Sequence, residues 1–204
     1  MLAFSAVLSG FYAATWAKQA PVILVVGDSI SAEYGLQRGQ GWVALLEKKL
    51  QAENKAVKVV NASISGDTTA GGRSRLAALL LQHQPTVVVI ELGGNDALRG
   101  LALTQSEANL IAMAQASQAA GAKVLLLGMQ VPPNYGADYA QQFEAIFKQT
   151  AKTTASRWVP AFLKGIADAA DPLQGFQADR IHPNGQAQPQ LLANMWPELK
   201  KLLP

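Results

Sequence analysis

The sequence predicts an α/β fold in which a mostly parallel central sheet lies between layers of helices. Two observations lead to this prediction. Four short apolar runs are bounded by glycine, proline or polar clusters, and they alternate with longer stretches in which apolar residues recur every three or four positions. Continuous apolar runs are typical of strands buried on both faces of a parallel sheet, and the longer spacing is typical of amphipathic helices. Alternating strands and helices are the order of a doubly wound sheet.

The expected elements begin at residue 22. The four strands are expected at residues 22–26, 57–60, 86–92 and 123–128. The helices between and after them are expected at residues 42–54, 69–83, 104–120 and 138–156, followed by a short apolar piece at 158–162 and a last helix from about 188 to 202. Pro189 favours this late start, because proline is tolerated in the first turn of a helix and disrupts later turns.

The N-terminal segment differs in character from the rest of the chain. Residues 2–17 are apolar, carry no charge before Lys18 and end in small residues beside a plausible cleavage point after Ala17. This pattern is typical of a secretory signal, although a positive n-region is missing, and a buried N-terminal element is the alternative. We expect a signal peptide or N-terminal extension at residues 1–20 and one domain at residues 21–204. The expected location is periplasmic or secreted, with the cytoplasm as the alternative.

Charge and composition exclude several kinds of chemistry. The formal charge of +3 is weak and scattered along the chain, which argues against a nucleic-acid partner. The chain has no cysteine, so it has no disulfide, thiolate nucleophile or cysteine-ligated zinc. His83 and His182 are its two histidines, too few for a multi-histidine metal site. Any histidine-dependent chemistry must therefore use one of these two side chains.

A serine stands at the end of the first predicted strand. Ligands of an open parallel sheet bind beyond the carboxyl ends of the strands, and the first apolar run leads straight into Gly27-Asp28-Ser29. Ser29 could act there as a nucleophile. Taken alone, however, a serine in this position more often caps the following helix.

The next two strand ends offer small polar groups to the same crevice. The second run leads into a loop that contains Gly66, and the third leads into Gly93-Gly94-Asn95-Asp96. Acyl transfer needs hydrogen-bond donors of this kind, because its tetrahedral intermediate develops negative charge on oxygen. Each loop taken singly is also explained as a turn whose Asn or Asp bonds its own backbone.

An acid and a histidine lie close together near the C-terminus. Asp179 precedes His182 by three residues, a spacing that can bring both side chains to one side of a turn. Pro183 keeps His182 out of the helical region, so the pair is expected on a constrained loop before the last helix. An isolated surface pair is the alternative. His83 is expected at a helix end on the opposite edge of the sheet.

These segments together resemble a known family. Gly27-Asp28-Ser29, Gly66, Gly93-Gly94-Asn95-Asp96 and Asp179-x-x-His182-Pro183 are similar, in order, to the four blocks of the SGNH (GDSL) hydrolases. The sequence at residues 41–42, 91–100 and 131–136 resembles that of the arylesterase, thioesterase I and lysophospholipase branch of this family. The resemblance extends over residues 22–204. It implies a flavodoxin-like three-layer α/β/α sandwich.

The resemblance also implies roles for individual residues. Ser29 would be the nucleophile, His182 the base and Asp179 the acid that orients it. The oxyanion hole would combine the backbone N–H groups of Ser29 and Gly66 with the side-chain amide of Asn95. Asp28 and Asp96 are expected to hold their loops. At two positions where the branch frequently has glycine, this chain has a different residue, namely Glu33 and Arg180. Because of these two differences, the resemblance does not define the rim of the pocket or the substrate preference.

The implied function is that of a serine esterase acting through an acyl-enzyme. Its substrate would be a small acyl ester, a thioester or a lysophospholipid, with no metal or organic cofactor, no nucleic-acid partner and no stable membrane span in the mature chain. We expect a monomer. The alternatives are a carbohydrate O-deacetylase and a non-catalytic lipid-binding module on the same fold. A pure binding module would not need all five site residues, and this favours an enzyme.

Overall fold

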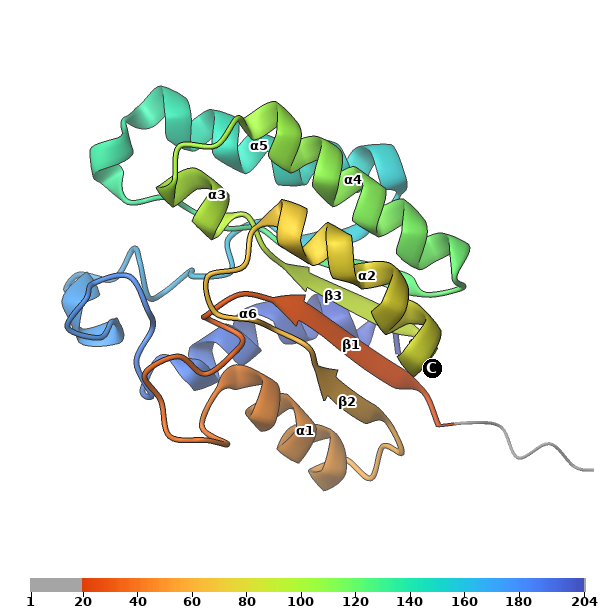
Figure 1. Ribbon diagram of the computed structural model, residues 1–204. Coiled ribbons are helices and arrows are strands. Elements are labelled where there is room, and N and C mark those ends of the chain that lie inside the picture. Colours follow the sequence, from red (N-terminus) through yellow and green to blue (C-terminus); the bar gives the residue numbers. More distant parts are fainter. Residues whose placement is uncertain (1–19, 204) are drawn as a thin grey trace, which may run out of the picture.

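The computed structural model describes residues 20–203 and contains one sheet of five parallel strands (Figure 1). The order across the sheet is β2-β1-β3-β4-β5. The strands are β1 Val22–Gly27, β2 Lys58–Asn61, β3 Val87–Glu91, β4 Lys123–Leu127 and β5 Arg157–Val159. The predicted cleavage site and the signal segment lie outside the described residues.

Helices cover both faces of the sheet (Figure 1). Helix α1 packs against α6 on one face, whereas α2, α4 and α5 pack side by side on the other. The helices are α1 Trp42–Ala52, α2 Thr69–His83, α3 Gly94–Leu98, α4 Leu103–Ala119, α5 Ala137–Thr154 and α6 Gln188–Lys200. This arrangement confirms the predicted α/β fold with a parallel central sheet between two layers of helices.

The central strands form the core. Every residue of β1 and of β3 is buried, as their continuous apolar sequences predict. Each fully buried Val, Leu or Ile side chain contributes about 1.5–3 kcal/mol relative to an exposed one. Trp42 at the start of α1 packs edge-on against Phe162 beyond β5, with ring centroids 5.5 Å apart, and so closes the core on the α1–α6 face. No helix within residues 20–203 is long and apolar enough to cross a membrane.

The strand order places the loops that follow β1 and β3 beside each other. β2 lies on one side of β1 and β3 on the other, so the chain runs from β1 to one side and then crosses back past β1 to reach β3. The register pairs Gly27 at the end of β1 with Glu91 at the end of β3. A point where the strand order reverses is where open α/β sheets bind ligands. Ser29 and Asn95 follow these two strand ends directly.

Candidate active site

The nucleophile loop, residues 27–31, is anchored in the core. The Asp28 N–H and the Ser31 hydroxyl both donate to Glu91 Oε2, at 3.3 and 2.6 Å. A Cβ on Gly27 would lie only 2.7–2.8 Å from the Ser31 Oγ and Glu91 Oε2 atoms, so glycine is required where the loop leaves β1. Ser29 sits in this loop with 8% of its surface exposed. The position of the serine is therefore set by a buried hydrogen-bond network.

Glu91 is a buried acid that the sequence interpretation missed. Burial, reinforced by the neighbouring Asp28 carboxylate, raises the pKa of the Glu91 carboxyl well above its usual range. Hydrogen bonds from Ser31 and from the Asp28 N–H act in the opposite direction and are outweighed. Both donors therefore meet a buried carboxyl group whose surroundings favour its neutral form. The available signal was an ionisable residue at the end of an otherwise apolar strand.

The base loop, residues 176–187, is organised by Asp179. One carboxylate oxygen, Oδ1, accepts the N–H groups of Ile181 and His182 at 2.9 and 3.0 Å. The other, Oδ2, lies 2.6 Å from His182 Nδ1, and His182 Nε2 lies 2.9 Å from Ser29 Oγ. The structure therefore brings Ser29, His182 and Asp179 into one continuous line of hydrogen bonds.

The carboxyl groups of Asp179 and of Asp28, which precedes Ser29, have opposite pKa shifts. Desolvation raises the pKa of Asp179, but the two backbone N–H groups and the imidazole outweigh it and hold the pKa at about 2. Burial raises the pKa of Asp28 to about 6, against the opposing effects of the Ile30 N–H, the His182 charge and the Asn95 amide. Asp179 is thus ionised at every pH at which an imidazole base is active.

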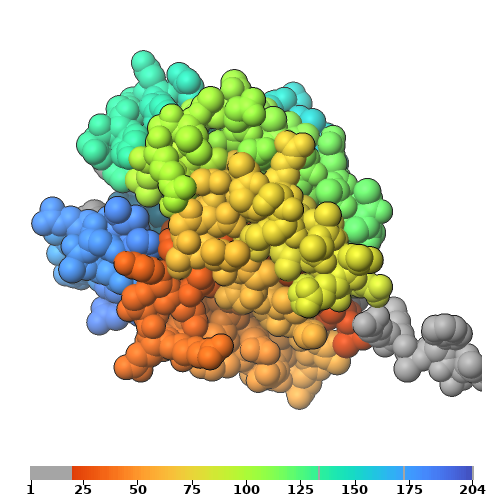
Figure 2. All heavy atoms as spheres, in the orientation of Figure 1, coloured from red at the N-terminus to blue at the C-terminus, as the bar shows by residue number. Residues whose placement is uncertain are grey.

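Tyr34 connects the base loop to the segment after β1. Its ring lies against the His182 ring, with centroids 4.4 Å apart and an angle of 39° between the planes. The side-chain amide of Gln177 donates to the Tyr34 and Pro183 carbonyls at 2.8 and 3.2 Å. In the space-filling view the two segments lie side by side at one edge of the molecule, in blue and red-orange (Figure 2). Neither contact was predicted.

The two residues that stand where the family branch frequently has glycine both adopt a left-handed backbone conformation. Glu33 and Arg180 each have φ of 61°, a conformation that glycine adopts without strain. Glu33 uses its carboxylate to accept the N–H groups of Gly39 and Gly41, the latter at 2.7 Å, and thereby closes the loop below Tyr34. The Arg180 side chain is exposed and has no hydrogen-bond partner within residues 20–203.

The loops that carry Gly66 and Asn95 flank the nucleophile loop. The Ile64 N–H donates to the Gly27 carbonyl at 3.0 Å, which holds the Gly66 loop against the end of β1. The Asn95 side-chain amide donates to Asp28 Oδ2 at 3.0 Å. Asp28 therefore contacts the side chain of Asn95 as well as its own loop, where only backbone bonds were expected.

Asp96 and His83 lie where the sequence interpretation expected them. Asp96 accepts the Thr69 N–H at 2.9 Å and the Ser106 hydroxyl at 2.9 Å, and so ties the start of α2 to α4. His83 is the last residue of α2, close to Thr86, whose N–H donates to the carbonyl of Val22 at the first position of β1. That is the opposite edge of the sheet from Ser29.

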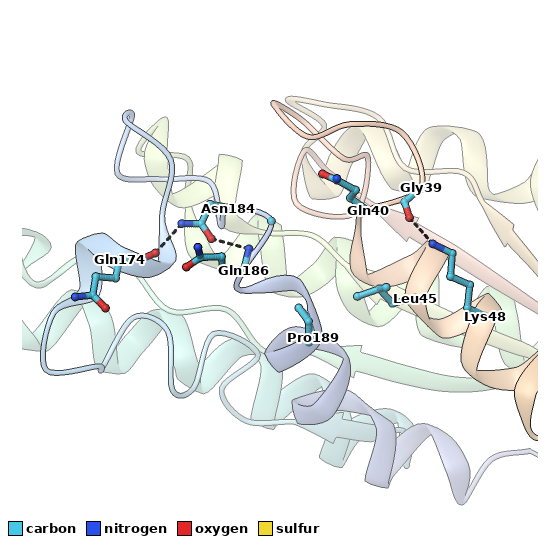
Figure 3. A pocket seen from close by; sticks show the side chains of 9 residues that line it. Gly39, Gln40, Leu45, Lys48, Gln174, Asn184, Gln186 and Pro189 are labelled. Atoms are coloured by element: carbon cyan, nitrogen blue, oxygen red, sulfur yellow. Dashed lines mark hydrogen bonds between the residues drawn. The ribbon is translucent and has the colours of Figure 1, made fainter.

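A cavity of about 700 Å³ lies behind the base loop, between residues 39–48 and residues 174–189 (Figure 3). The Asn184 side chain on its wall donates to the Gln174 carbonyl at 2.6 Å and accepts the Gln186 N–H at 3.0 Å, so the amide supports the loop (Figure 3). Neither Ser29 nor His182 lines this cavity. Residues 20–203 contain no group of three His, Cys, Asp or Glu side chains placed to hold a metal ion.

Comparisons with known proteins show the family of this chain. The family model for GDSL-like lipases and acylhydrolases matches residues 25–188. The chain is 56% identical to Esterase TesA of Pseudomonas aeruginosa over 185 residues, which cover 90% of each chain. It is 43% identical to the Thioesterase 1/protease 1/lysophospholipase L1 of Escherichia coli over 187 residues, 92% of this chain and 87% of that one.

Solved structures agree with these sequence relatives. A crystal structure of TesA matches with a TM-score of 0.86 at 55% identity, covering 89% of this chain and 99% of that one. The psychrotrophic esterase EstA from Pseudoalteromonas sp., in a structure inhibited by monoethylphosphonate, matches with a TM-score of 0.82 at 42% identity, covering 88% and 97%. The chain therefore belongs to the GDSL-like lipase/acylhydrolase family of enzymes.

Proposed function

We propose that this protein is a serine esterase that hydrolyses carboxylic esters and thioesters of acyl substrates, with Ser29 as nucleophile, His182 as base and Asp179 as the orienting acid. The observation that carries the proposal is the line of short contacts, 2.9 Å from Ser29 Oγ to His182 Nε2 and 2.6 Å from His182 Nδ1 to Asp179. Such a line is the arrangement that activates a hydroxyl nucleophile.

The reaction follows from these contacts in two halves. His182 Nε2 takes the Ser29 proton while Oγ attacks the acyl carbonyl, and the imidazolium then gives that proton to the leaving alcohol or thiol. A water molecule, deprotonated by the same nitrogen, attacks the carbonyl of the acyl-enzyme. The bond between Ser29 Oγ and the acyl carbon then breaks, Nε2 returns the proton to Oγ, and the acid leaves. Because the pKa of Asp179 is about 2, its carboxylate stays ionised, holds the proton of His182 on Nδ1 and stabilises the imidazolium. No step calls for a metal or an organic cofactor.

The proposed oxyanion hole consists of the backbone N–H groups of Ser29 and Gly66 and the side-chain amide of Asn95. An amide nitrogen carries two hydrogens, and Asn95 donates one of them to Asp28 at 3.0 Å. The second hydrogen remains for the oxygen that becomes anionic in the transition state, where a preorganised donor has its largest effect. Asp28 supports this role because it restricts the rotation of the amide.

An acyl substrate also suits the surface around the triad. Large apolar side chains are exposed in the loops and at the end of α3 on this edge of the sheet, namely Tyr34, Ile64, Leu98, Leu101 and Ile181. Relatives of this chain are named as an esterase, a thioesterase and lysophospholipase, and an arylesterase of Vibrio mimicus at 38% identity. We extend these three substrate classes to this protein, with a small acyl ester, thioester or lysophospholipid as the substrate.

The same proposal includes the organisation and location of the chain. Residues 21–204 would form one hydrolase domain that acts as a monomer without a nucleic-acid partner. Residues 1–20 would be a signal peptide or N-terminal extension, and the enzyme would act in the periplasm or outside the cell. Mass spectrometry of the protein purified from its native compartment tests this: a mature chain that begins near Lys18 supports it, and a full-length cytoplasmic chain contradicts it.

The function is tested by a panel of substrates. Hydrolysis rates are measured for nitrophenyl esters of increasing acyl length, for an acyl thioester and for a lysophospholipid. Ser29→Ala serves as the matched control because it removes a single oxygen atom from the site. We expect turnover by the wild type with a clear optimum of chain length, and none by Ser29→Ala. Absence of turnover on every member of the panel would contradict the proposed function.

A further inference from the structure

Arg99 joins the two loops that carry the proposed oxyanion donors. It follows α3 directly, and its backbone N–H donates to the Asn95 carbonyl at 3.1 Å. Its guanidinium Nη2 donates to the Gly66 carbonyl at 2.7 Å. A Cβ added at Gly66 would lie 3.5 Å from the same nitrogen, so the guanidinium sits immediately beside this glycine. The Arg99 side chain is thereby held at the rim of the site although it is exposed.

The positive charge of Arg99 has no counter-ion in the part of the chain that the structure describes. The nearby Arg75 differs in this respect, since its Nη2 forms an ion pair with Asp67 at 2.8 Å. No carboxylate within residues 20–203 forms such a pair with Arg99, and within these residues one guanidinium N–H group is used, on the Gly66 carbonyl. A guanidinium has five donors in a planar fork, a geometry that matches phosphate oxygens. The remaining donors are free to bind an anionic group of a ligand.

The distance to the reacting carbonyl limits which anion can reach this arginine. Bond lengths and hydrogen-bond lengths together place an oxygen held by the Gly66 N–H within about 10 Å of the guanidinium. In a lysophospholipid, three glycerol carbons separate the scissile ester from the phosphate, which fits this reach. In an acyl thioester of coenzyme A, the long pantetheine arm separates the thioester from the phosphates and carries them further away.

We propose that Arg99 binds the phosphate of a lysophospholipid while Ser29 attacks its acyl ester, and so acts as a specificity-determining residue. The inference rests on the proposed function, because it assumes that the carbonyl oxygen of the substrate lies between Gly66 and Asn95. The phosphate stays on the leaving glycerol and takes no part in bond breaking. Its contact with Arg99 forms on binding and should lower KM more than it raises kcat.

The test uses two substrates that differ in the phosphoglycerol head group, which carries the only charge: octanoyl-lysophosphatidylglycerol and monooctanoylglycerol, both below their critical micelle concentrations. Arg99→Gln removes the charge but keeps an amide that can donate to the Gly66 carbonyl. We expect kcat/KM for the lysophospholipid to fall roughly 10- to 100-fold, mainly through KM, because hydrogen bonds to charged groups are the strong ones. The value for monooctanoylglycerol should change less than about threefold, since its binding uses no charge.

The matched control is Lys200→Gln, which removes one positive charge from the last turn of α6. Lys123 at the first position of β4 donates to the carbonyl of Leu202, so this end of α6 lies at the edge of the sheet opposite the site. Both rates should stay at wild-type values in this variant. Equal losses on the two substrates in Arg99→Gln would mean that Arg99 only supports the Gly66 loop, and no loss would leave it without a role. Either result overturns the proposal.

A binding experiment separates this inference from the proposed function. Calorimetry with the ether-linked analogue of octanoyl-lysophosphatidylglycerol measures recognition without hydrolysis. Arg99-dependent binding of the ether would support the inference even if the panel of esters were not hydrolysed. Hydrolysis of nitrophenyl esters together with equal affinity of wild type and Arg99→Gln for the ether would overturn the inference and leave the proposed function standing. The rate of acyl-coenzyme A hydrolysis should be the same in wild type and Arg99→Gln.

Discussion

The nucleophile loop and the base loop each depend on a carboxyl group, but in opposite ways. Glu91 behind Ser29 is fully buried, and burial raises the pKa of its carboxyl, whereas the Asp179 side chain behind His182 is 36% exposed and its pKa is lowered to about 2. The same functional group thus serves as a buried scaffold in one loop and as an ionised partner in the other. Burial and hydrogen bonding to the ionised form are what separate these roles.

Substitutions in the two loops should differ in whether they change stability together with catalysis. The nucleophile loop is bonded to the core through Glu91 and Ser31, so a change there should affect both folding and turnover. The base loop is held by its own turn and by the Tyr34 ring, so a change there should affect turnover with little effect on folding. The variants below test this difference.

The largest effect among them is expected for Asp179→Asn in the base loop. The amide can still accept a backbone N–H, but it favours the wrong imidazole tautomer, so kcat should fall by roughly 10² to 10⁴. The side chain is exposed, and we expect the melting temperature at pH 7 to change by no more than a few degrees. Kinetics and thermal unfolding measured on the same preparation check both parts. A near-normal kcat would mean that catalysis depends on Ser29 and His182 without Asp179.

The pH dependence provides a second check on Asp179. Its folded pKa of about 2 lies below the ordinary value of 3.8, so its contribution to stability is present above about pH 4 and is lost as the pH falls through 2. Thermal unfolding measured from pH 7 down to pH 2 checks this. The loss of stability below pH 4 should be smaller in Asp179→Asn than in wild type, and an equal loss in the two proteins would contradict the lowered pKa.

Asn95→Ala should lower kcat about a hundredfold, with a smaller change in KM, because the amide bond strengthens only as the oxygen becomes anionic. Asn95→Asp is the sharper variant. If Asn95 were only a turn residue, Asp would accept the same backbone bonds and retain activity. If the amide stabilises the oxyanion, Asp should be at least as damaging as Ala, since its carboxylate would also face Asp28. An active Asn95→Asp enzyme with an unchanged melting temperature refutes the oxyanion role.

Substitutions of Glu91 test the buried scaffold in the nucleophile loop. Glu91→Gln supplies a neutral acceptor for Ser31 and the Asp28 N–H, and we expect its free energy of unfolding to stay close to that of wild type and its kcat to stay within a few-fold. Glu91→Leu leaves both donors buried without a partner, which should cost about 1–3 kcal/mol for each unpaired group and lower kcat as well. Chemical denaturation compares the two variants. Loss of stability in Glu91→Gln equal to that in Glu91→Leu would show that the ionised form is required.

The smallest effect on stability is expected at Arg180 and Glu33, two residues with the same φ of 61°. Arg180→Gly should stabilise the protein by up to about 1 kcal/mol, because glycine adopts this conformation without strain and the arginine has no partner within the described residues to lose. Glu33→Gly should not stabilise it, because the gain is offset by loss of the bonds from Gly39 and Gly41. Denaturation midpoints measure both. Equal stabilisation by the two substitutions would mean that the Glu33 bonds contribute nothing.

Much of the fold and the candidate site could be predicted from local patterns. The apolar runs predicted β1 and β3, and the order of the motifs predicted which strand ends carry Ser29, Gly66 and Asn95. Strand β5 was described only as a short apolar piece, because three residues, two of them not buried, show no usable periodicity. Helix α3 is not predicted, because a five-residue segment that starts at the second of two consecutive glycines, Gly93 and Gly94, resembles a turn.

The contacts that position the site could not be predicted in the same way. The bond between Ser31 and Glu91 joins residues 60 positions apart, and that between Asn95 and Asp28 joins residues 67 apart. Such pairs form only when β1 and β3 lie side by side, so local periodicity carries no information about them. The Tyr34–His182 contact depends in addition on how two loops fold over the edge of the sheet.

The most direct test of the proposed triad is reaction with a fluorophosphonate probe followed by peptide mapping. The account predicts one label per chain, on Ser29, with no labelling of Ser29→Ala and much slower labelling of His182→Ala. Both variants should unfold at close to the wild-type temperature. A label on another serine, or an unlabelled wild-type enzyme that still hydrolyses esters, would contradict the assignment of Ser29 as the nucleophile.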